Sequence, residues 1–157
     1  MPAKGFSTEL DQALARKDAN ELTRIIDAYE AYFQDTDGEG EWPEKWSEAF
    51  GDTLDYASSD PDKALAYVVL AAARSNCVSF LAFLACGPLE DILREPSAAM
   101  TDRIVTEARK SPRFRWLLSH PFKVAVSERV WVAIEPFRIT GPHEEPCHDT
   151  MPKSYFG

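Results

Sequence analysis

Prolines placed where helices would begin are the feature that most constrains how this chain can fold. Pro61 follows Asp60, and Pro112 follows Ser111. An Asp or Ser side chain can cap the first turn of a helix, and proline suits the first helical position because it has no N–H to leave unpaired. Pro43 precedes a helical pattern in the same way. Apolar residues recur three and four positions apart after these starts, and no Asn-Gly hairpin signal occurs, so the sequence predicts an all-α fold.

Helical segments are expected at about residues 7–17, 18–34, 43–57, 61–74, 76–86, 88–95, 97–110, 112–118 and 127–134. The last of these could also be a strand, because residues 124–134 are rich in β-branched side chains, but Val130, Trp131 and Ile134 share one helical face and favour a helix. We expect a single helical domain over residues 1–135, built as a bundle or short array of about eight helices. Residues 136–157 contain four prolines and are expected to form an irregular tail that either wraps the body or is mobile.

Two local patterns are predicted to shape the middle of the fold. In the sequence GPLED, Gly87 is expected to end one helix in the left-handed conformation and Pro88 to open the next, which makes a helix-turn-helix corner. In the sequence PRFR, helical spacing places Phe114 on the inner face and both arginines on the outer face. The helix that begins near Pro43 is expected to bury Leu54.

Composition excludes several classes of protein. A chain that is 45% hydrophobic and 27% charged is too apolar for disorder and too charged for a membrane protein. The most apolar stretch, residues 64–86, is interrupted at 74–76, so neither half reaches the roughly 20 residues that span a bilayer. The first residues show no secretory signal, and three cysteines without CxxC spacing favour a reduced environment. We therefore expect a cytoplasmic protein with no membrane partner.

The charge is concentrated in one segment. Residues 30–62 hold eleven acids against one base, Lys45, a formal charge of −10, whereas the rest of the chain has 15 acids and 16 bases. Residues 103–129 reverse the sign, with seven bases against two acids. An acidic surface repels phosphate backbones and steers basic surfaces toward it. We therefore expect a protein partner with a basic surface and no nucleic acid; a solvated face that only keeps the protein soluble is the other interpretation.

No residue pattern points to a catalytic centre. His120 is the only His within the helical body, and it fits better as a residue at a helix C-terminus than as the base of a nucleophile. Glu90 and Asp91 are explained by their place in the first turn of a helix. The tail holds four possible metal ligands, His143, Cys147, His148 and Asp149. Their spacing fits no closed zinc site, so the sequence predicts no catalytic residue, no metal site and no cofactor.

A family resemblance becomes visible in the segments LACGPLEDIL and ARKSPRFRWLL. Together with Trp46, DPDKALAYVVLAAA and ERVW, they resemble a family of uncharacterised, mostly bacterial domains that share an AGPLEDLL corner and a PRFR segment. The resemblance covers about residues 42–134, and this chain has Cys86 where that corner more often has alanine. It implies an all-helical domain, and it brings no established activity and no agreed catalytic residues.

The best candidate site is an acidic loop that ends in an aromatic side chain. Its residues are Asp35, Asp37, Glu39, Glu41, Trp42 and Glu44. Acidic groups steer a basic partner and tryptophan is a common interface anchor, although Trp42 could instead pack as a staple at the start of the next helix. We expect a non-enzymatic acidic interaction protein, such as an immunity or inhibitor protein that neutralises a basic toxin. The alternative is a helical enzyme or ligand-binding domain with a cleft near the GPLED and PRFR helices, and a regulatory or scaffold domain is a third interpretation.

Overall fold

Helices form most of the computed structural model, which describes residues 19–155. The elements are α2 (Ala19–Thr36), α3 (Glu44–Ser59), α4 (Pro61–Arg74), α5 (Val78–Leu84), the π-helical turn η1 (Ala85–Leu89), α6 (Glu90–Arg94), α7 (Ala98–Lys110), α8 (Pro112–Leu118), the 3-10 turn η2 (Lys123–Ala125), α9 (Glu128–Ile134) and the 3-10 turns η3 (Glu135–Phe137) and η4 (His148–Thr150). No strand occurs in residues 19–155, so the all-α prediction is confirmed. The helix expected at 7–17 lies outside the described residues.

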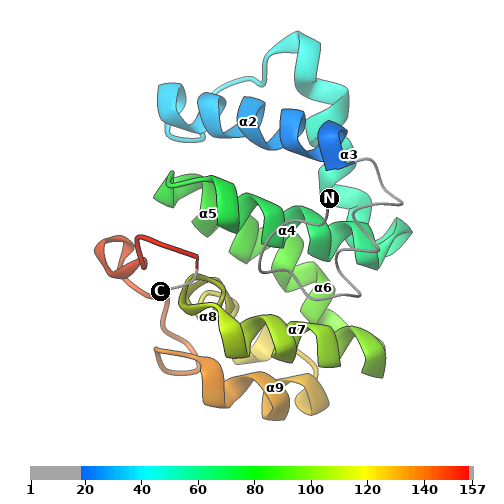
Figure 1. The fold of residues 1–157 in the computed structure, drawn as a ribbon, viewed down its shortest axis with the longest axis vertical. Coiled ribbons are helices and arrows are strands. Elements are labelled where there is room, and N and C mark those ends of the chain that lie inside the picture. Colours follow the sequence, from blue (N-terminus) through cyan, green and yellow to red (C-terminus); the bar gives the residue numbers. More distant parts are fainter. Residues whose placement is uncertain (1–18, 156–157) are drawn as a thin grey trace.

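The helices are stacked in three tiers. Figure 1 shows α2 and α3 at one end of the molecule, α4, α5 and α6 in the middle, and α7, α8 and α9 at the other end. Every residue from 64 to 72 in α4 is buried, as expected for a helix that is apolar nearly all round. The acidic segment 30–62 therefore lies mainly at the α2 and α3 end, and the basic segment 103–129 at the α7 to α9 end.

Most helix starts and buried faces agree with the sequence. The side chains of Asp60, Ser97 and Ser111 accept hydrogen bonds from the backbone N–H three residues later, at 3.3, 3.1 and 3.0 Å. The caps at Asp60 and Ser111 are those predicted before α4 and α8, and Ser97 caps α7 in the same way. The buried face of α2 consists of Leu22, Ile25, Ile26, Tyr29, Tyr32 and Phe33, the apolar residues spaced for one helical stripe. The helical interpretation of residues 127–134 is also confirmed.

The prediction of a corner at GPLED is wrong. The helical path continues from α5 through η1 into α6, and Gly87 has no positive φ. Inside an α-helix the ring of Pro88 would clash with the carbonyl group four residues earlier, and its missing N–H would leave that carbonyl unpaired. The wider π-helical turn relieves this conflict without breaking the helix. Gly87 and Pro88, residue types that usually end a helix, are thus accommodated within a continuous helical path.

Two predicted exposures are also wrong. Arg113 is only 2% exposed, although helical spacing placed it outside, because its guanidinium group finds carbonyl partners within the protein. Leu54 is 39% exposed, although it was expected in the core, because the buried side of α3 is formed by Phe50, Thr53 and Tyr56.

The irregular tail wraps the body. Arg138 donates hydrogen bonds to the carbonyl groups of Leu118 and Pro121, at 2.8 and 2.6 Å. Farther along, the indole N–H of Trp116 donates to the Thr150 hydroxyl at 3.1 Å, and the buried Tyr155 phenol donates to a Glu107 carboxylate that is itself fully buried. Residues 138–155 are therefore tied to α7 and α8 by specific polar contacts.

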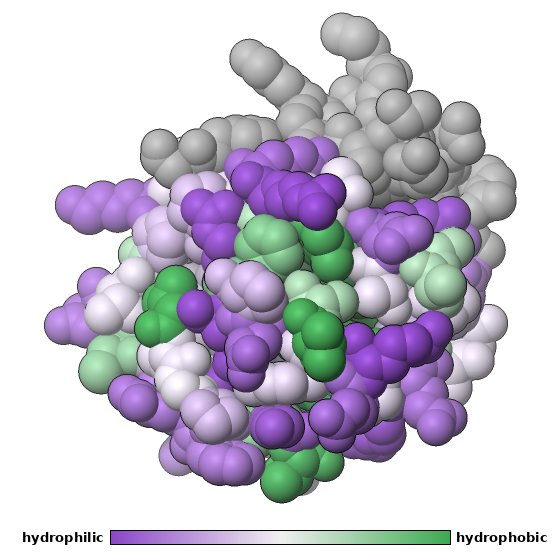
Figure 2. Space-filling model, turned by 90° about the horizontal axis from the view of Figure 1, so that it is seen from below, coloured by the Kyte–Doolittle hydropathy of each residue, from purple (hydrophilic) through white to green (hydrophobic). Residues whose placement is uncertain are grey.

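Isolated apolar side chains are exposed at the α9 end of the molecule. Val124 is 84% exposed and Val132 is 67% exposed. Figure 2, which views the molecule from this end, shows hydrophobic side chains interspersed with hydrophilic ones. Scattered exposure of this kind is normal for a protein surface. Within residues 19–155, no helix combines the length and the apolar character that crossing a bilayer requires.

Candidate functional site

An aromatic cluster joins α2 to α3 beneath the candidate site. The rings of Tyr29 and Phe50 are stacked with centroids 3.9 Å apart, and Trp46 stacks on Phe50 at 6.1 Å. Trp42 meets the edges of Tyr29 and Phe50 at 6.0 and 5.8 Å. The half-buried Trp42 therefore packs against the core at the start of α3, the packing role that was weighed against an interface role.

The loop between the two helices has a defined conformation. The buried Tyr32 hydroxyl donates to the carbonyl of Gly40 at 2.7 Å, which ties the loop to α2. Asp37 and Gly38 both have positive φ, 58° and 86°, a conformation that Asp tolerates and Gly adopts freely. A side chain at Gly38 would begin 2.5 Å from the ring of Phe33, so only glycine fits there. The exposed carboxylates of this loop are therefore presented from a constrained backbone.

A groove of about 470 Å³ lies between α2, the loop and α3. Its apolar lining comes from Ala28, Ala31, Tyr32, Pro43 and Trp46, and its charged lining from Asp35, Glu41 and Lys45. Because the charged residues are exposed while Tyr32 is buried and Trp46 is half-buried, the charges stand at the rim above an apolar floor. Pockets of this size hold small organic ligands or side chains.

The structure separates the predicted site residues into two groups. Asp35 and Glu41 line the groove together, although Asp35 belongs to the last turn of α2 and not to the loop. Asp37, Glu39 and Glu44 are exposed on the surface outside the groove lining.

Of the groove residues, only Asp35 and Glu41 were predicted as site residues, and the prediction missed the two aromatic residues and the one base that line it. Tyr32 and Trp46 carry the spacing of core residues, and Lys45 is an isolated base in an acidic segment. The available signal was the presence of two tryptophans close together, Trp42 just before α3 and Trp46 in its first turn.

Eight carboxylates in this region have no ion-pair partner among residues 19–155. We call them the acidic surface: Asp35, Asp37, Glu39, Glu41, Glu44, Glu48, Asp52 and Asp55, all exposed. The last four recur every three or four positions, so they follow one side of α3. Lys45 is the only base within this stretch.

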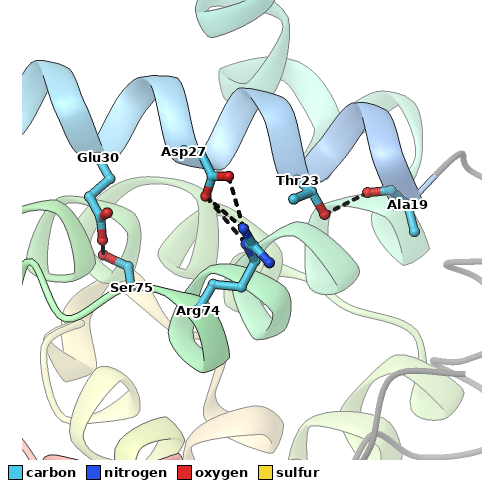
Figure 3. A network of polar contacts seen from close by, with 6 residues as sticks. All are labelled: Ala19, Thr23, Asp27, Glu30, Arg74 and Ser75. Atoms are coloured by element: carbon cyan, nitrogen blue, oxygen red, sulfur yellow. Dashed lines mark hydrogen bonds and ion pairs between the residues drawn. The ribbon is translucent and has the colours of Figure 1, made fainter.

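Carboxylates nearer α4 are satisfied within the protein. Figure 3 shows Asp27 of α2 receiving hydrogen bonds from Arg74, with the shortest N–O distance at 2.8 Å, and Glu30 accepting one from the Ser75 hydroxyl. Asp62 forms an ion pair with Arg103 of α7. The acidic surface is thus the set of exposed carboxylates in segment 30–62 that have no ion-pair partner among the described residues.

The basic segment is used to hold backbone carbonyl groups. Arg113 donates to the carbonyls of Ala72 and Ser75 at the end of α4, at 2.9 and 2.8 Å. Arg115 donates to Ala108 at the end of α7, at 2.6 Å, and Arg129 makes a similar contact at 2.7 Å with Pro96. The last carbonyls of a helix lack partners within it, so Arg113 and Arg115 cap helix ends, whereas Arg129 holds a carbonyl of the loop between α6 and α7. The PRFR segment thereby has a structural explanation that needs no nucleic acid.

Two titratable groups near the tail are poorly suited to catalysis. Cys86 donates to a carboxylate oxygen of Glu145 at 3.3 Å, and desolvation together with this carboxylate raises the pKa of the thiol to about 12. A thiol with such a pKa is a poor nucleophile at neutral pH. His120 is 2% exposed, its Nδ1 lies 3.0 Å from the Trp116 carbonyl, and burial lowers its pKa below the usual range. His120 follows the C-cap residue of α8, so its expected place at a helix C-terminus is confirmed, and its burial favours the neutral form of the ring.

A second groove, of about 570 Å³, lies between α6 and residues 124–127. Asp91, Arg94 and Glu95 line it, and Arg94 contacts Asp91 at 3.3 Å. No residue of PRFR lines this groove. Within residues 19–155, His, Cys, Asp and Glu side chains form no group of three that could hold a metal ion.

These features define an all-α protein with an unbalanced acidic surface around a small apolar groove. The chain belongs to a family of unknown function, DUF6869, whose model matches residues 34–141. The expectation of membership in a family of uncharacterised domains is confirmed, over a range that extends past both ends of residues 42–134. Comparison with curated proteins and with solved structures found no match.

Proposed function

We propose that this protein is a non-enzymatic interaction protein that binds a protein partner through its acidic surface, and that the partner's contact face is basic. The observation that carries the proposal is that most basic side chains are engaged within the protein, whereas many acidic side chains are not. The bases of residues 103–129 are largely consumed by contacts within the protein, whereas eight exposed carboxylates have no counterion among residues 19–155.

Uncompensated charge of one sign is costly for an isolated protein, because like charges repel within the folded state. The same charge accelerates association with an oppositely charged surface by long-range attraction. An immunity or inhibitor protein that neutralises a basic toxin gains directly from fast association, and we include that role in the proposal. We also propose that the protein acts in the bacterial cytoplasm, with which its three free cysteines are consistent.

The proposal is tested by capturing partners with two charge variants of the full chain. The first variant carries Asp35→Asn, Asp37→Asn, Glu39→Gln and Glu41→Gln. The second carries Glu95→Gln, Asp102→Asn, Glu128→Gln and Asp149→Asn, four exposed carboxylates outside the acidic surface. Both variants have the same net charge, so they separate the position of the charge from its amount.

A captured basic protein that binds the wild type and the second variant supports the proposal if it binds the first variant with slower association. At low salt we expect association to slow at least about fivefold, with dissociation nearly unchanged. The difference should shrink as salt is raised, because exposed charges are screened beyond about 8 Å at physiological ionic strength. Equal kinetics for the two variants, or capture of acidic proteins alone, would contradict the proposal.

The groove beside α6 supports a second candidate, a ligand-binding function. Its lining combines Asp91, Arg94 and Glu95 with apolar residues 124–126, a mixture typical of small-molecule sites. Thermal stabilisation by a compound library, abolished by Arg94→Ala, would favour this candidate. Stabilisation that survives this substitution would argue against this groove as the site.

A further inference from the structure

We propose that the groove between α2 and α3 is an anchor site for one basic side chain of the partner, an arginine or a lysine. This inference deepens the proposed function and rests on it, because it assigns a specific contact to a surface otherwise described by its charge. It further assigns Lys45 as an internal competitor of that side chain.

The groove matches both parts of a basic side chain. Arginine and lysine carry an apolar stem and a charged head, and they bury the stem while the head stays near water. The apolar floor of Ala28, Tyr32 and Trp46 suits the stem. The exposed carboxylates of Asp35 and Glu41 stand at the rim and have no ion-pair partner among residues 19–155, so they can receive the head.

The walls of the groove are ordered before any partner arrives. Tyr32 is 6% exposed and its hydroxyl is bonded to the Gly40 carbonyl, while Trp46 is stacked on Phe50. A preformed site loses little conformational freedom on binding, which favours affinity from a small contact area.

Lys45 already makes the contact that the groove offers to a cation. Its Nζ lies over the Trp46 ring, 5.7 Å from the centroid, and its side chain is one of the groove's lining residues. A cation at this distance is attracted by the electron-rich face of the ring. An incoming basic side chain would have to displace this ammonium group and would be repelled by it. Removing Lys45 should therefore strengthen binding.

Lys63 provides a matched control for that prediction. Its Nζ lies 4.5 Å from the centroid of the Tyr56 ring, so it is also a lysine in contact with an aromatic ring, near the start of α4. It is not among the residues that line the groove. Lys45→Ala and Lys63→Ala change the net charge equally, and only the first clears the groove.

The test is a nuclear magnetic resonance titration of the full chain with acetyl-Gly-Arg-Leu-Gly-amide, with acetyl-Gly-Gln-Leu-Gly-amide as the neutral control. We expect saturable shifts at the Trp46 indole N–H and at backbone amides of residues 28–46 with the arginine peptide only. Lys45→Ala should tighten binding about threefold or more, and Lys63→Ala should change it less than about 1.5-fold.

A second pair of variants locates the carboxylates that matter. Asp35→Asn with Glu41→Gln removes the rim charges, whereas Glu48→Gln with Asp52→Asn removes two charges from the same acidic surface outside the groove. We expect the first pair to weaken peptide binding at least about fivefold and the second pair less than about twofold. Circular dichroism spectra that match the wild type establish that each variant is folded.

Three results would overturn the anchor site. They are equal weakening by the two carboxylate pairs, equal effects of Lys45→Ala and Lys63→Ala, and no arginine-specific shift in the groove at about 10 mM peptide, the range of weak anchoring contacts. Each would leave the proposed function standing, because the acidic surface can act through summed charge without a groove. Failure of the proposed function is seen separately, as equal partner kinetics for the two fourfold variants.

Discussion

Gly38 and Gly87 show that the same residue type is required at one place and dispensable at another. Gly38 has a φ of 86° and lies against the Phe33 ring, where the loop leaves α2. Gly87 lies within a continuous helical path, has no positive φ and has open space where a side chain would begin. The backbone conformation and the space around each glycine therefore decide how much stability a substitution loses.

We predict that Gly38→Ala lowers the free energy of unfolding by more than about 1 kcal/mol. The new Cβ would begin 2.5 Å from a Phe33 ring carbon and would also hold an unfavourable φ. Gly40→Ala is the control, because Gly40 has a φ of 93° with nothing within 4 Å and pays only the conformational cost. Urea denaturation measures both, and equal losses would show that the Phe33 contact is relieved without cost.

We predict that Gly87→Ala, in contrast, raises the free energy of unfolding. Glycine within a helix is less stable than alanine by roughly 0.5–1 kcal/mol, because glycine loses more freedom on folding. Since a Cβ at Gly87 meets nothing within 4 Å, we expect the variant to gain about that amount. A loss of stability in the same denaturation assay would mean that the π-helical turn needs glycine after all.

His120 makes stability depend on pH. Burial lowers its pKa in the folded state, so below the unfolded value of about 6.5 the unfolded chain binds more protons than the folded one. Stability should therefore be full above about pH 6.5 and fall as the pH drops below it, by no more than about 1.4 kcal/mol per pH unit from this residue. Comparing denaturation at pH 7.5 and 5.5 for the wild type and His120→Phe isolates this contribution. An identical pH dependence in the two proteins would contradict the assignment.

At the scale of elements, the buried Arg113 connects parts of the chain that are distant in sequence. Arg113 of α8 reaches two carbonyls at the end of α4, the side chain of Asn76 at 3.0 Å and the Pro152 carbonyl of the tail at 3.0 Å. Three parts of the chain thus converge on one planar group. Lysine cannot reproduce this, because its ammonium group is a single point with three donors.

We predict that Arg113→Lys lowers the free energy of unfolding by about 2–4 kcal/mol, since several buried acceptors would lose their donors. Arg109→Lys is the matched control, because Arg109 is exposed on the neighbouring helix and should change stability by less than about 0.5 kcal/mol. Thermal unfolding followed by circular dichroism measures the difference. Similar melting temperatures for the two variants would show that the carbonyl contacts contribute little.

These elements also show what the sequence could predict. The caps at Asp60 and Ser111 act over three residues, so the local sequence was enough to place α4 and α8. The continuity of the helical path at Gly87 was not predictable, because a glycine followed by a proline is compatible with both a helix end and a π-helical turn. The burial of Arg113 depends on carbonyls about 40 positions earlier, which no local spacing reveals.

The candidate site also has a part that the sequence could predict and a part that depends on packing. The exposed acids followed from charge counting alone, since almost no base lies near them in sequence. The groove did not follow, because it forms only where Asp35 of α2 and Glu41 of the loop meet Trp46 of α3. Trp42 and Trp46 both pack on Phe50, and Trp42 also meets the edge of Tyr29, so the sequence alone does not reveal that Trp46 is the one of the two that lines the groove.

At the scale of the whole molecule, charge is separated between the two ends of the stack. Segment 30–62 holds the uncompensated carboxylates, whereas most bases of α7 to α9 are engaged with carbonyls or carboxylates. Such a separation stores repulsive energy at the acidic end. A partner that covers this end would relieve the repulsion.

We predict that Asp52→Asn with Asp55→Asn stabilises the free protein by about 0.5–1 kcal/mol at low salt. Both residues lie in the second half of α3, where negative charge opposes the helix dipole and adds to repulsion on the acidic surface. The gain should fall in about 0.5 M salt, because screening weakens both effects. Thermal unfolding at the two salt concentrations measures it, and a gain that does not depend on salt would point to a cause other than charge.

The reach of the tail affects how the protein can be divided for experiments. The family match ends at residue 141, yet Tyr155 covers the buried Glu107 and Thr150 receives the Trp116 indole proton. A recombinant fragment trimmed to 34–141 would lack these contacts, and also the whole buried stripe of α2, which contributes to the aromatic cluster. Protease digestion should therefore leave a resistant piece that is longer than the family at both ends. Fragments prepared for partner screening need at least residues 19–155, or a lost interaction would report unfolding of the bait and not the absence of a partner.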